Sequence, residues 1–419
     1  MIYAKKIEIV FDEKDTNILD GQSKICNWLY NQLLQVTIED YKNGNQNKLL
    51  SGRNLRDFAT KMKESNKFLY AVHSSPLKNT AIRLKESYTK FFSKNCSYPN
   101  FRSFKKKWFS LYYDEPNKGF KLLDSRNLRV ALGKNELNKQ MYIKGYLRER
   151  FELKNDEKIK TFRLCKQQGN KFYAIFTIEK EDKPKKEVKS WIAIDQNHKN
   201  LFVAVDNEGT TFEFDKLYQV KYFDKLIDEV KSKRDLCNRK NKLKYTEHGS
   251  KYYLPSKRYL KLNNVLDKLY HKRREQIKLI MYSIANYIAK NYDKAVIGDY
   301  TPTLEVANEK NMHRGMLNQS LVGMFRKILS WTMEKYNKTC IVVDEKDTTK
   351  ACCICGDLEK KDPSIREFTC KKCNTTILRD VNSAINIGRK ENLEPTKKVL
   401  NKILKKGYFR FDRYILEGI

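Results

Sequence analysis

The sequence predicts a multi-domain protein of the α/β class in which strand-rich and helix-rich segments are partly separated, a multi-domain α+β organisation. Three observations support this prediction. The chain has 419 residues, which is enough for two or three domains. Hydrophobic residues make up 40% and aromatic residues 12%, which is enough to fill hydrophobic cores. A charged segment with one proline, from Glu179 to Lys189, is typical of a linker and separates two differently patterned halves.

The charge balance predicts an anionic partner. The chain carries 85 Lys and Arg residues against 51 Asp and Glu residues, which leaves a formal net charge of +34. Such a surplus repels itself unless a partner of opposite charge offsets it. Nucleic acid matches it best, because each phosphate contact by Lys or Arg releases counterions. The alternative is a basic protein that is merely soluble.

The sequence gives no sign of a membrane protein. It contains no run of about 20 apolar residues, so no spanning helix is expected. The first ten residues mix Lys5, Lys6 and Glu8 into an alternating pattern that is unlike a signal peptide. We therefore expect an intracellular protein, in the cytoplasm or nucleoid of a bacterium or in the nucleus for a eukaryotic or viral host. Neither a membrane nor a small-molecule substrate is expected as a partner.

The first half of the chain predicts a small β-barrel with a helical insertion. A strand over 3–10 precedes a helix over 23–41, in which apolar residues recur at helical spacing. Ser75 and Pro76 predict the start of another helix, as N-cap and first-turn residue. Short β-rich stretches then follow at Trp108–Tyr113, Leu128–Leu132, Met141–Ile143, Thr161–Leu164 and Phe172–Ile178.

The second half predicts an RNase H-like nuclease domain. An apolar strand, Trp191–Ile194, precedes a hairpin whose strands are Leu201–Val205 and Thr210–Phe214. A long basic helical region with an apolar stripe follows. After it come a strand at Ala295–Ile297, a helix around Leu317–Tyr336, a strand at Cys340–Val343 and a helix from about Val381. The order βββαβαβ, then an insert, then α, is the order that this fold requires.

The insert predicts a structural zinc site. Cys352 and Cys355 form one C-x2-C pair, and Cys370 and Cys373 form a second pair at zinc-ribbon spacing. Four thiolates satisfy the tetrahedral coordination of Zn²⁺ and leave no open position for water. This metal is therefore expected to fold the ribbon and to take no part in chemistry. A disulfide or redox pair is the alternative.

Acidic residues follow the strands where a hydrolytic centre is expected. Hydrolysis of a phosphodiester commonly uses two divalent cations about 4 Å apart, held by three or four carboxylates. Asp195 ends the first strand of the second half, and Asp380 opens its last helix. Taken alone, each is a turn or cap residue. Together, in this topology, they predict two of the acids of a magnesium-binding nuclease centre.

The third acid is ambiguous. The strand Ala295–Ile297 is where such a site usually takes a glutamate, but this chain reads Gly298-Asp299. Asp299 is one candidate, although a shift of one residue turns a strand side chain to the other face. Glu345, just past the next strand, is the preferred candidate, because neighbouring strands are only about 4.8 Å apart. A site without a third acid, and so without activity, is the remaining possibility.

With these motifs assembled, the chain resembles the TnpB and Fanzor families, which are transposon-encoded RNA-guided DNA endonucleases related to the type V CRISPR effectors. The resemblance runs nearly end to end. It includes "CNWLYNQLL", "SSPLKNTAIRLKESYTKFFSKNCSYPNFRSFKKK", "IAIDQNHKNL", "VIGDYTP", "VVDEKDTTKACCICG" and "RDVNSAINIGR". The last two are the most specific, because they combine the zinc knuckle with the final aspartate.

The resemblance implies a domain layout. A wedge β-barrel would comprise residues 1–12 and 96–182, with a helical recognition domain at 13–95. A RuvC-like nuclease domain would comprise 190–346 and 379–395, interrupted by a zinc-ribbon, target-nucleic-acid-binding insert at 347–378. A basic tail would occupy 396–419.

The chain departs from the family pattern at two places. Gln196-Asn197 follows the first aspartate where relatives usually have x-Gly, and asparagine tolerates the positive φ of that turn. Gly298 stands where many TnpB proteins have the catalytic glutamate. Fanzor proteins and one branch of TnpB share this Gly-Asp pair and move the glutamate to the later "DE", which implies Glu345. Nuclease-dead relatives that act as RNA-guided repressors also occur.

The resemblance further implies the partners: an omega-type guide RNA and double-stranded target DNA, of which a short flanking motif is read directly. Asn79, where TnpB has a base-contacting glutamine, could pair with an adenine edge; a plain surface residue is the alternative. The remaining candidates for nucleic-acid binding are basic: Lys78, Lys105, Lys106, Lys107, Lys272, Arg273, Arg274 and Arg379.

Overall fold

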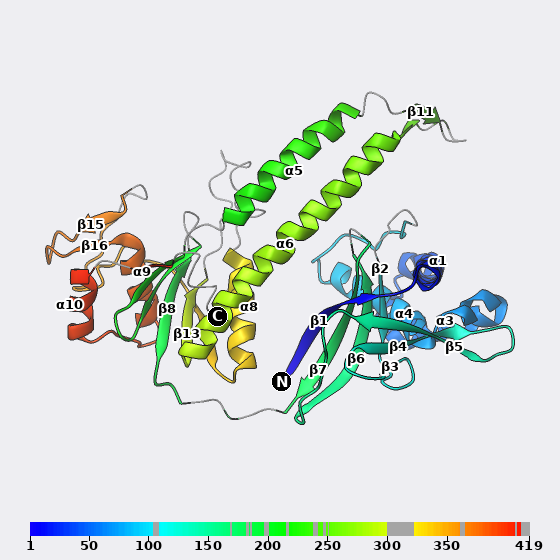
Figure 1. Ribbon diagram of the computed structural model, residues 1–419, viewed down its shortest axis with the longest axis horizontal. Coiled ribbons are helices and arrows are strands. Elements are labelled where there is room, and N and C mark those ends of the chain that lie inside the picture. Colours follow the sequence, from blue (N-terminus) through cyan, green and yellow to red (C-terminus); the bar gives the residue numbers. More distant parts are fainter. Residues whose placement is uncertain are drawn as a thin grey trace. The chain divides into compact units, whose positions relative to one another are not determined.

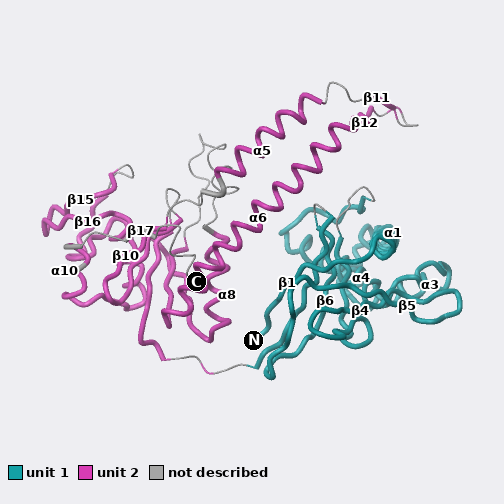
Figure 2. The backbone as a smooth tube through the Cα atoms, in the orientation of Figure 1, with its two compact units in different colours: residues 1–182 teal, residues 183–419 magenta. Residues whose placement is uncertain are grey.

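The structure is a computed structural model. It describes residues 1–103, 109–167, 170–181, 184, 187–196, 201–214, 218–237, 242–245, 249, 251–299, 322–360, 365–406 and 409–411. The chain forms two compact units, residues 1–182 and residues 183–419 (Figure 2). Among the described residues, no helix combines the length and the apolar character needed to cross a membrane.

Unit 1 is built on a seven-stranded antiparallel sheet with the order β2-β6-β7-β1-β5-β4-β3. Its strands confirm the β-rich stretches predicted from the sequence. Their bounds are β1 Ile2–Val10, β2 Phe109–Tyr113, β3 Phe120–Leu122, β4 Asn127–Lys134, β5 Gln140–Leu147, β6 Glu157–Lys166 and β7 Phe172–Lys180. The first strand of the chain lies at the centre of this sheet, paired with β7 along almost its whole length.

The sheet curls around an aromatic core. Phe120 of the edge strand β3 lies 5.2 Å, ring centroid to centroid, from Phe162 of β6, although four strands separate β3 from β6 in the order of the sheet. Phe162 also contacts Phe176 of β7 at 5.4 Å, and Phe176 stacks on Phe151 at 4.6 Å. A flat sheet could not bring β3 and β6 together, so the curl is what buries these rings.

The helical insertion between β1 and β2 comprises α1 Glu13–Lys42, α2 Gln46–Leu50, α3 Gly52–Ser65, the 3-10 turn η1 Lys67–Ala71 and α4 Ser74–Phe92. The prediction for the start of α4 is wrong by two residues. His73, not Ser75, is the N-cap, and its Nδ1 accepts a hydrogen bond from the Ser75 backbone N–H at 3.2 Å. An imidazole nitrogen can accept this bond as a hydroxyl does, which the usual N-cap preferences do not anticipate.

One glycine fixes how the insertion meets the sheet. A Cβ on Gly133 of β4 would overlap the backbone of Tyr70 and Ala71 in η1. The strand can approach the turn this closely only because no side chain lies between them.

Unit 2 contains a six-stranded sheet with the order β14-β13-β8-β9-β10-β17. The bounds are β8 Trp191–Gln196, β9 Phe202–Asp206, β10 Thr211–Phe214, β13 Lys294–Gly298, β14 Thr339–Val343 and β17 Phe409–Phe411. The first three are antiparallel neighbours, whereas β13 runs parallel to β8 and to β14. This is the RNase H-like arrangement predicted from the order of elements.

Helices cover both faces of this sheet (Figure 1). On one face, α6 Lys257–Asn291 and α8 Val322–Lys335 pack on Ile194, Phe202 and Ile297. On the other, α9 Arg379–Arg389 and α10 Lys397–Lys406 pack on the alternate side chains, such as Trp191 and Val203. Each fully buried side chain of this kind contributes about 1.5–3 kcal/mol, so the two cores hold β8 firmly between them.

A long helical hairpin extends from unit 2. It pairs α5 Tyr218–Leu236 with the 35-residue α6, and a small antiparallel hairpin, β11 Lys242–Tyr245 and β12 Lys251–Leu254, lies at its tip (Figure 1). The apolar stripe predicted from the sequence packs on Phe223 of α5 through Leu266, and on the sheet further along α6 through Ile284 and Ile288.

Candidate functional site

The four predicted cysteines come together as a candidate zinc site. The sulfurs of Cys352, Cys355, Cys370 and Cys373 all lie within 4.8 Å of one another. The Sγ distances are 3.7 Å for Cys352 to Cys373 and 3.6 Å for Cys355 to Cys370. Thiolates around tetrahedral zinc are about 3.8 Å apart, given Zn–S bonds of about 2.3 Å. Both observed distances are far too long for disulfide bonds, so the arrangement fits a zinc ion.

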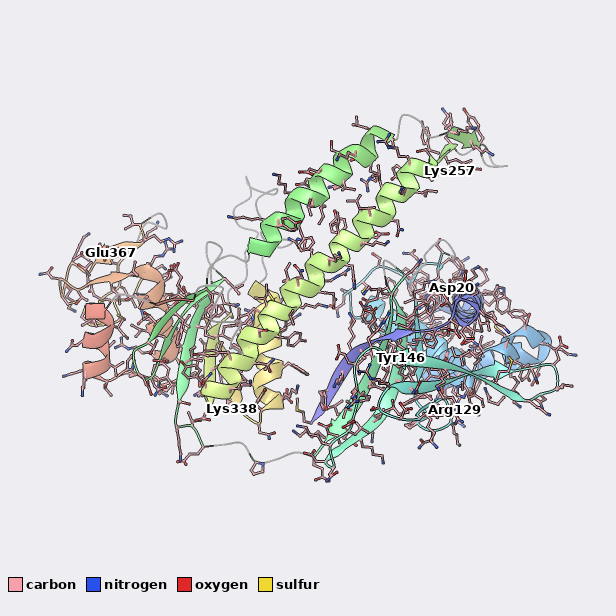
Figure 3. The ribbon with its side chains drawn as sticks, viewed as in Figure 1. Asp20, Arg129, Tyr146, Lys257, Lys338 and Glu367 are labelled. Atoms are coloured by element: carbon pink, nitrogen blue, oxygen red, sulfur yellow. The ribbon has the colours of Figure 1, made fainter. Side chains whose placement is uncertain are left out.

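The ribbon is continuous with the helix that carries Asp380. Strands β15 Glu367–Thr369 and β16 Thr376–Leu378 form its hairpin, and α9 begins directly after β16. Figure 3 shows Glu367 at the start of this hairpin. The chain therefore passes from the last cysteine to Asp380 through one short strand.

Two asparagines fasten the first zinc knuckle to α9. Asn382 and Asn386 lie one helical turn apart and are buried. The side-chain amide of each donates to the Ala351 carbonyl at 2.8 Å, and Asn382 Oδ1 accepts from the Cys353 backbone N–H at 2.7 Å. These bonds satisfy loop groups that would otherwise be buried without partners. The knuckle and α9 should therefore move as one body.

Removing the zinc is expected to abolish function through geometry. Cys355→Ser should leave less than one zinc per chain and lower activity by roughly 100-fold or more, because the ribbon no longer fixes α9. Zinc content by mass spectrometry measures the first effect, and cleavage of nucleic acid, the activity expected from the sequence, measures the second. Cys96→Ser, which replaces an exposed cysteine outside the ribbon, should change neither. Full activity of zinc-free protein would contradict this prediction.

The sheet places Asp195 and Gly298 next to each other. Ile194 of β8 pairs with Ile297 of the parallel strand β13, so the following residues, Asp195 and Gly298, stand side by side at the carboxyl ends of the two strands. By strand alternation they face the same way as Ala193 and Val296, which contact α9. Asp380 lies in the first turn of α9. The fold thus brings the first and last predicted acids to one edge.

Glu345 occupies the space above Gly298. Val343 of β14 pairs with Gly298, and Glu345 follows two residues later. A Cβ added to Gly298 would overlap the carboxyl group of Glu345. The glutamate side chain therefore lies where a side chain of residue 298 would project, beside Asp195. Glu345 can occupy this position only because residue 298 of β13 has no side chain.

Asp299 has a different position. Its Oδ1 accepts a hydrogen bond from the Glu345 backbone N–H at 3.2 Å, and its own N–H donates to the Val343 carbonyl at 2.8 Å. The residue is exposed. The structure thus uses Asp299 to hold the backbone that carries Glu345.

The carboxylates of Asp195, Glu345 and Asp380 interact electrostatically. Burial raises the pKa of Asp195 well above its usual value, and the charges of Glu345 and Asp380 raise it further. A hydrogen bond from the Ser383 hydroxyl and the charge of Arg379 act in the opposite direction. Like charges gathered in a buried place are costly unless a cation joins them. This electrostatic pattern, with oxygen donors only, fits hard divalent cations such as Mg²⁺.

Two arginines hold Asp380. The Arg366 guanidinium pairs through Nη1 with Oδ2, and the Arg379 guanidinium lies 3.3 Å from Oδ1. Both carboxylate oxygens of Asp380 are thus turned toward arginines.

The cost of burying Asp195 leads to a stability prediction. Because its pKa is higher in the folded protein than in the unfolded chain, the metal-free fold is less stable above that pKa than below it. Asp195→Asn should thus stabilise the metal-free protein at neutral pH by roughly 1 kcal/mol while removing a predicted cation ligand. Denaturant unfolding with and without the substitution, at pH 5 and at pH 8, measures this. Destabilisation at pH 8 would contradict it.

The basic residues predicted to bind nucleic acid have varied surroundings. Lys78 is exposed and pairs with Glu115 at 3.1 Å. Arg273 of α6 pairs with Asp224 of α5 at 2.8 Å, so it ties the long helices together. Lys272 and Arg274 are exposed on α6. Lys105, Lys106 and Lys107 lie outside the described residues.

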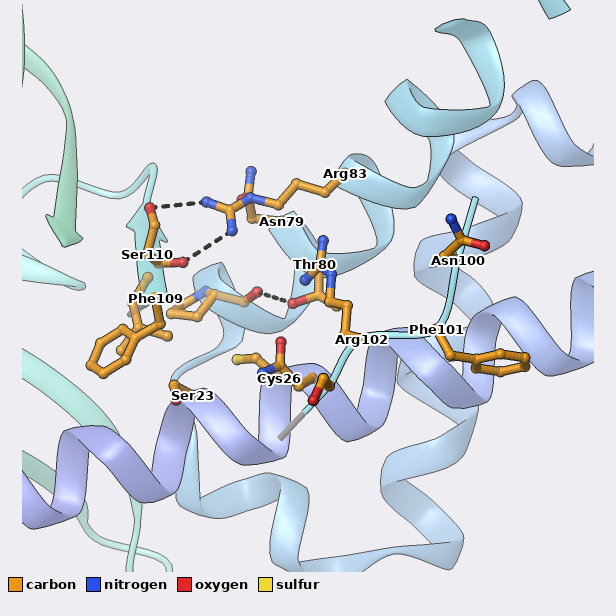
Figure 4. Close-up of a pocket in the computed structure, with 14 residues that line it drawn as sticks. Ser23, Cys26, Asn79, Thr80, Arg83, Asn100, Phe101, Arg102, Phe109 and Ser110 are labelled. Carbon is orange, nitrogen blue, oxygen red and sulfur yellow. Dashed lines mark hydrogen bonds between the residues drawn. The ribbon is translucent and has the colours of Figure 1, made fainter. Parts of the chain in front are cut away.

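Asn79 lines a cavity of about 400 Å³ in unit 1. The cavity lies between α1, α4 and the segment before β2, and Figure 4 shows Asn79, Asn100 and Arg102 among the side chains around it. Arg83 donates to the Ser110 carbonyl at 3.0 Å and to its hydroxyl at 3.1 Å. Burial lowers the pKa of both Arg83 and Arg102, and the charge of Arg102 lowers the pKa of Arg83 further. A cavity lined by amides and cations suits a polar, electron-rich group.

Several polar residues near the acids are not among those predicted from the sequence. Thr348 donates to the Glu345 carbonyl at 2.8 Å and shares a hydrogen bond of 3.2 Å with Ser383. The other residues of this kind are Asn382, Asn386 and Arg366. The pair of asparagines at helical spacing inside an otherwise apolar stripe was a usable signal, since a buried amide needs partners. No sequence signal pointed to Arg366, because only the register of the ribbon hairpin brings it to Asp380.

Comparisons with known proteins agree with this architecture. Residues 323–387 match the family model described as Cas12f1-like, TNB domain. The fold also matches a cryo-EM structure of a Cas12f1–sgRNA–target DNA complex, with a TM-score of 0.61 and 16% identity over 90% of this chain and 83% of that one. The chain has a Cas12f1-like fold. The predicted fold class and the predicted resemblance to relatives of the type V CRISPR effectors are confirmed.

Two further structures are similar over most of their length. A CRISPR-Cas12f ternary complex matches with 14% identity over 92% of this chain and 83% of that one, at a TM-score of 0.35. CasPhi-2 (Cas12j) bound to crRNA matches with 10% identity over 93% and 98%, at a TM-score of 0.41. No curated protein matches. The Cas12f1-like segment of the chain includes Glu345, the four cysteines and Asp380, whereas Asp195 lies before it.

Proposed function

We propose that this protein is an RNA-guided DNA endonuclease that binds a guide RNA, recognises a short motif beside the target and cleaves DNA with Mg²⁺. The observation that carries the proposal is the side chain of Glu345 in the space above Gly298, beside Asp195. A third acid at this point adds a like charge that raises the pKa of the buried Asp195. A cation site is the simplest reason to keep it there.

In this proposal Asp195, Glu345 and Asp380 would hold the cations. Two Mg²⁺ ions bound there would activate water and stabilise the charge on the leaving oxygen. Asp195, fixed between two cores, provides the rigid ligand, and Ser383 orients its carboxylate. Asp299 and Thr348 hold the backbone of Glu345, and Arg379 lies where it could contact a scissile phosphate.

The nucleic-acid partners are inferred from charge and from the similar structures. The relative of similar fold was solved with an sgRNA and target DNA. A surplus of +34 suits the same kind of partner here. The exposed Lys272 and Arg274 would contact phosphates, and the cavity at Asn79 would receive a base edge of the flanking motif. The wedge and recognition domains expected from the sequence belong to this proposal.

The arginines on Asp380 favour a second candidate function, an RNA-guided DNA-binding protein or repressor that does not cut. Both candidates predict guided binding. Purified protein with its guide RNA should therefore be tested on matched and mismatched DNA, with Mg²⁺ or with EDTA. Cleavage of matched DNA in Mg²⁺, lost in Asp195→Ala, is the result expected for the nuclease. Guided binding without cleavage in Mg²⁺ or Mn²⁺ would support the repressor, and binding that ignores the guide would contradict both.

A further inference from the structure

A salt bridge from Arg366 joins the zinc ribbon to Asp380, and the role inferred for it rests on the proposed cation site. Arg366 lies four residues before Cys370, at the base of the β15–β16 hairpin. The register pairs Glu367 with Leu378, and the Arg379 backbone N–H donates to the Arg366 carbonyl at 2.7 Å. Arg366 and Arg379 are therefore opposite each other at the open end of the hairpin, and both guanidinium groups reach the same carboxylate.

The two arginines divide the oxygens of Asp380. Arg366 takes Oδ2 and Arg379 takes Oδ1, and the Asp380 side chain is only 8% exposed. The Arg366 side chain is 29% exposed, so this pair is partly shielded from solvent and its charge-assisted bond is worth more than one on the surface. A divalent cation bound by Asp380 needs one of these oxygens and is repelled by a guanidinium close to it.

We infer that Arg366 is a positioning residue for the proposed cation site: it serves as the internal counter-charge of Asp380 and leaves that carboxylate when a divalent cation binds. Arg379 precedes Asp380 in the same helix, so it stays beside the carboxylate when the cation binds. Arg366 instead comes from the ribbon, so the zinc-held hairpin sets its reach. The zinc ribbon would thus control how readily the acids accept a cation, which a purely structural insert would not do.

Cation binding by the full-length, zinc-loaded protein without RNA or DNA tests this inference. Mn²⁺ would be the probe, with its affinity measured by titration calorimetry and by electron paramagnetic resonance. Arg366→Ala should bind Mn²⁺ about tenfold more tightly than the parent protein, because a charge-assisted bond no longer competes for Asp380. Arg366→Lys, which keeps the charge, should return most of the way to the parent affinity.

Matched variants separate the explanations. Lys371→Ala removes the same charge from the same ribbon, where Lys371 is 84% exposed and pairs with Glu359, and it should leave Mn²⁺ affinity within about twofold. Zinc content of one per chain confirms that each ribbon is intact. Unchanged or weaker Mn²⁺ binding by Arg366→Ala, or an equal gain in Lys371→Ala, would overturn the inference while leaving the nuclease proposal standing. Mn²⁺ affinity unaffected by Asp195→Ala would instead remove the cation site and with it the proposed function.

Discussion

Glu345→Ala is expected to lower guided DNA cleavage by about a thousandfold or more, comparable to the loss of a group that stabilises the transition state directly. The reason is its position. The carboxylate lies beside Asp195 in the space that Gly298 leaves open, and the substitution removes one of the three proposed cation ligands. Single-turnover cleavage at saturating guide RNA measures the effect, and guided binding of target DNA should persist.

Asp299→Ala is the informative comparison, because Asp299 is the other acid that the sequence offered. It holds the Glu345 backbone through one hydrogen bond of 3.2 Å, so its loss should cost about tenfold, in the range of residues that orient a ligand. Abolition of cleavage by Asp299→Ala together with retention by Glu345→Ala would reverse the assignment.

Gly298→Ala is expected to be nearly as damaging to cleavage, although it adds a single methyl group. That methyl would overlap the Glu345 carboxyl. The far end of a flexible side chain can move aside at small cost, so the fold should be retained with a change in stability of about 1 kcal/mol or less. The displaced carboxylate no longer reaches the cation site, so cleavage should fall by about a hundredfold or more.

A second glycine provides the control. For Gly323 in α8, apart from its chain neighbours and the backbone of its own helix, none of the described residues has an atom within 4 Å of the point where a Cβ would be added. Gly323→Ala should therefore keep full cleavage and stabilise the helix slightly. Thermal unfolding and cleavage of the two variants, measured side by side, distinguish a local displacement from a general intolerance of alanine. Full activity of Gly298→Ala would contradict the assigned position of Glu345.

Much of the fold could be predicted because burial leaves a clear pattern in this sequence. Strand β8 is buried along its whole length and reads as an apolar run that ends in Asp195. The hairpin of β9 and β10 follows from its turn residues, and α6 from its stripe. The N-cap of α4 could not be predicted, because His73 caps through a ring nitrogen that is seldom used in this way.

Less of the candidate site than of the fold could be predicted from the sequence. The spacing of the cysteines predicts their cluster, because the two pairs supply all four ligands. For the third acid, strand spacing and the resemblance favoured Glu345, and Asp299 stayed as the alternative because it directly follows Gly298 in the chain. The register of three parallel strands and the space above Gly298 resolve where each side chain lies. Arg366 depends on a hairpin register that no local pattern encodes.

The most direct test of the site is a swap of its third acid. Gly298→Glu combined with Glu345→Ala returns a carboxylate to β13 while removing the one after β14. If Glu345 substitutes for the missing side chain of residue 298, Glu345→Ala should be inactive, and the double variant should regain cleavage to within about a hundredfold of the parent protein. Cleavage by Glu345→Ala at the parent rate would contradict the proposed centre.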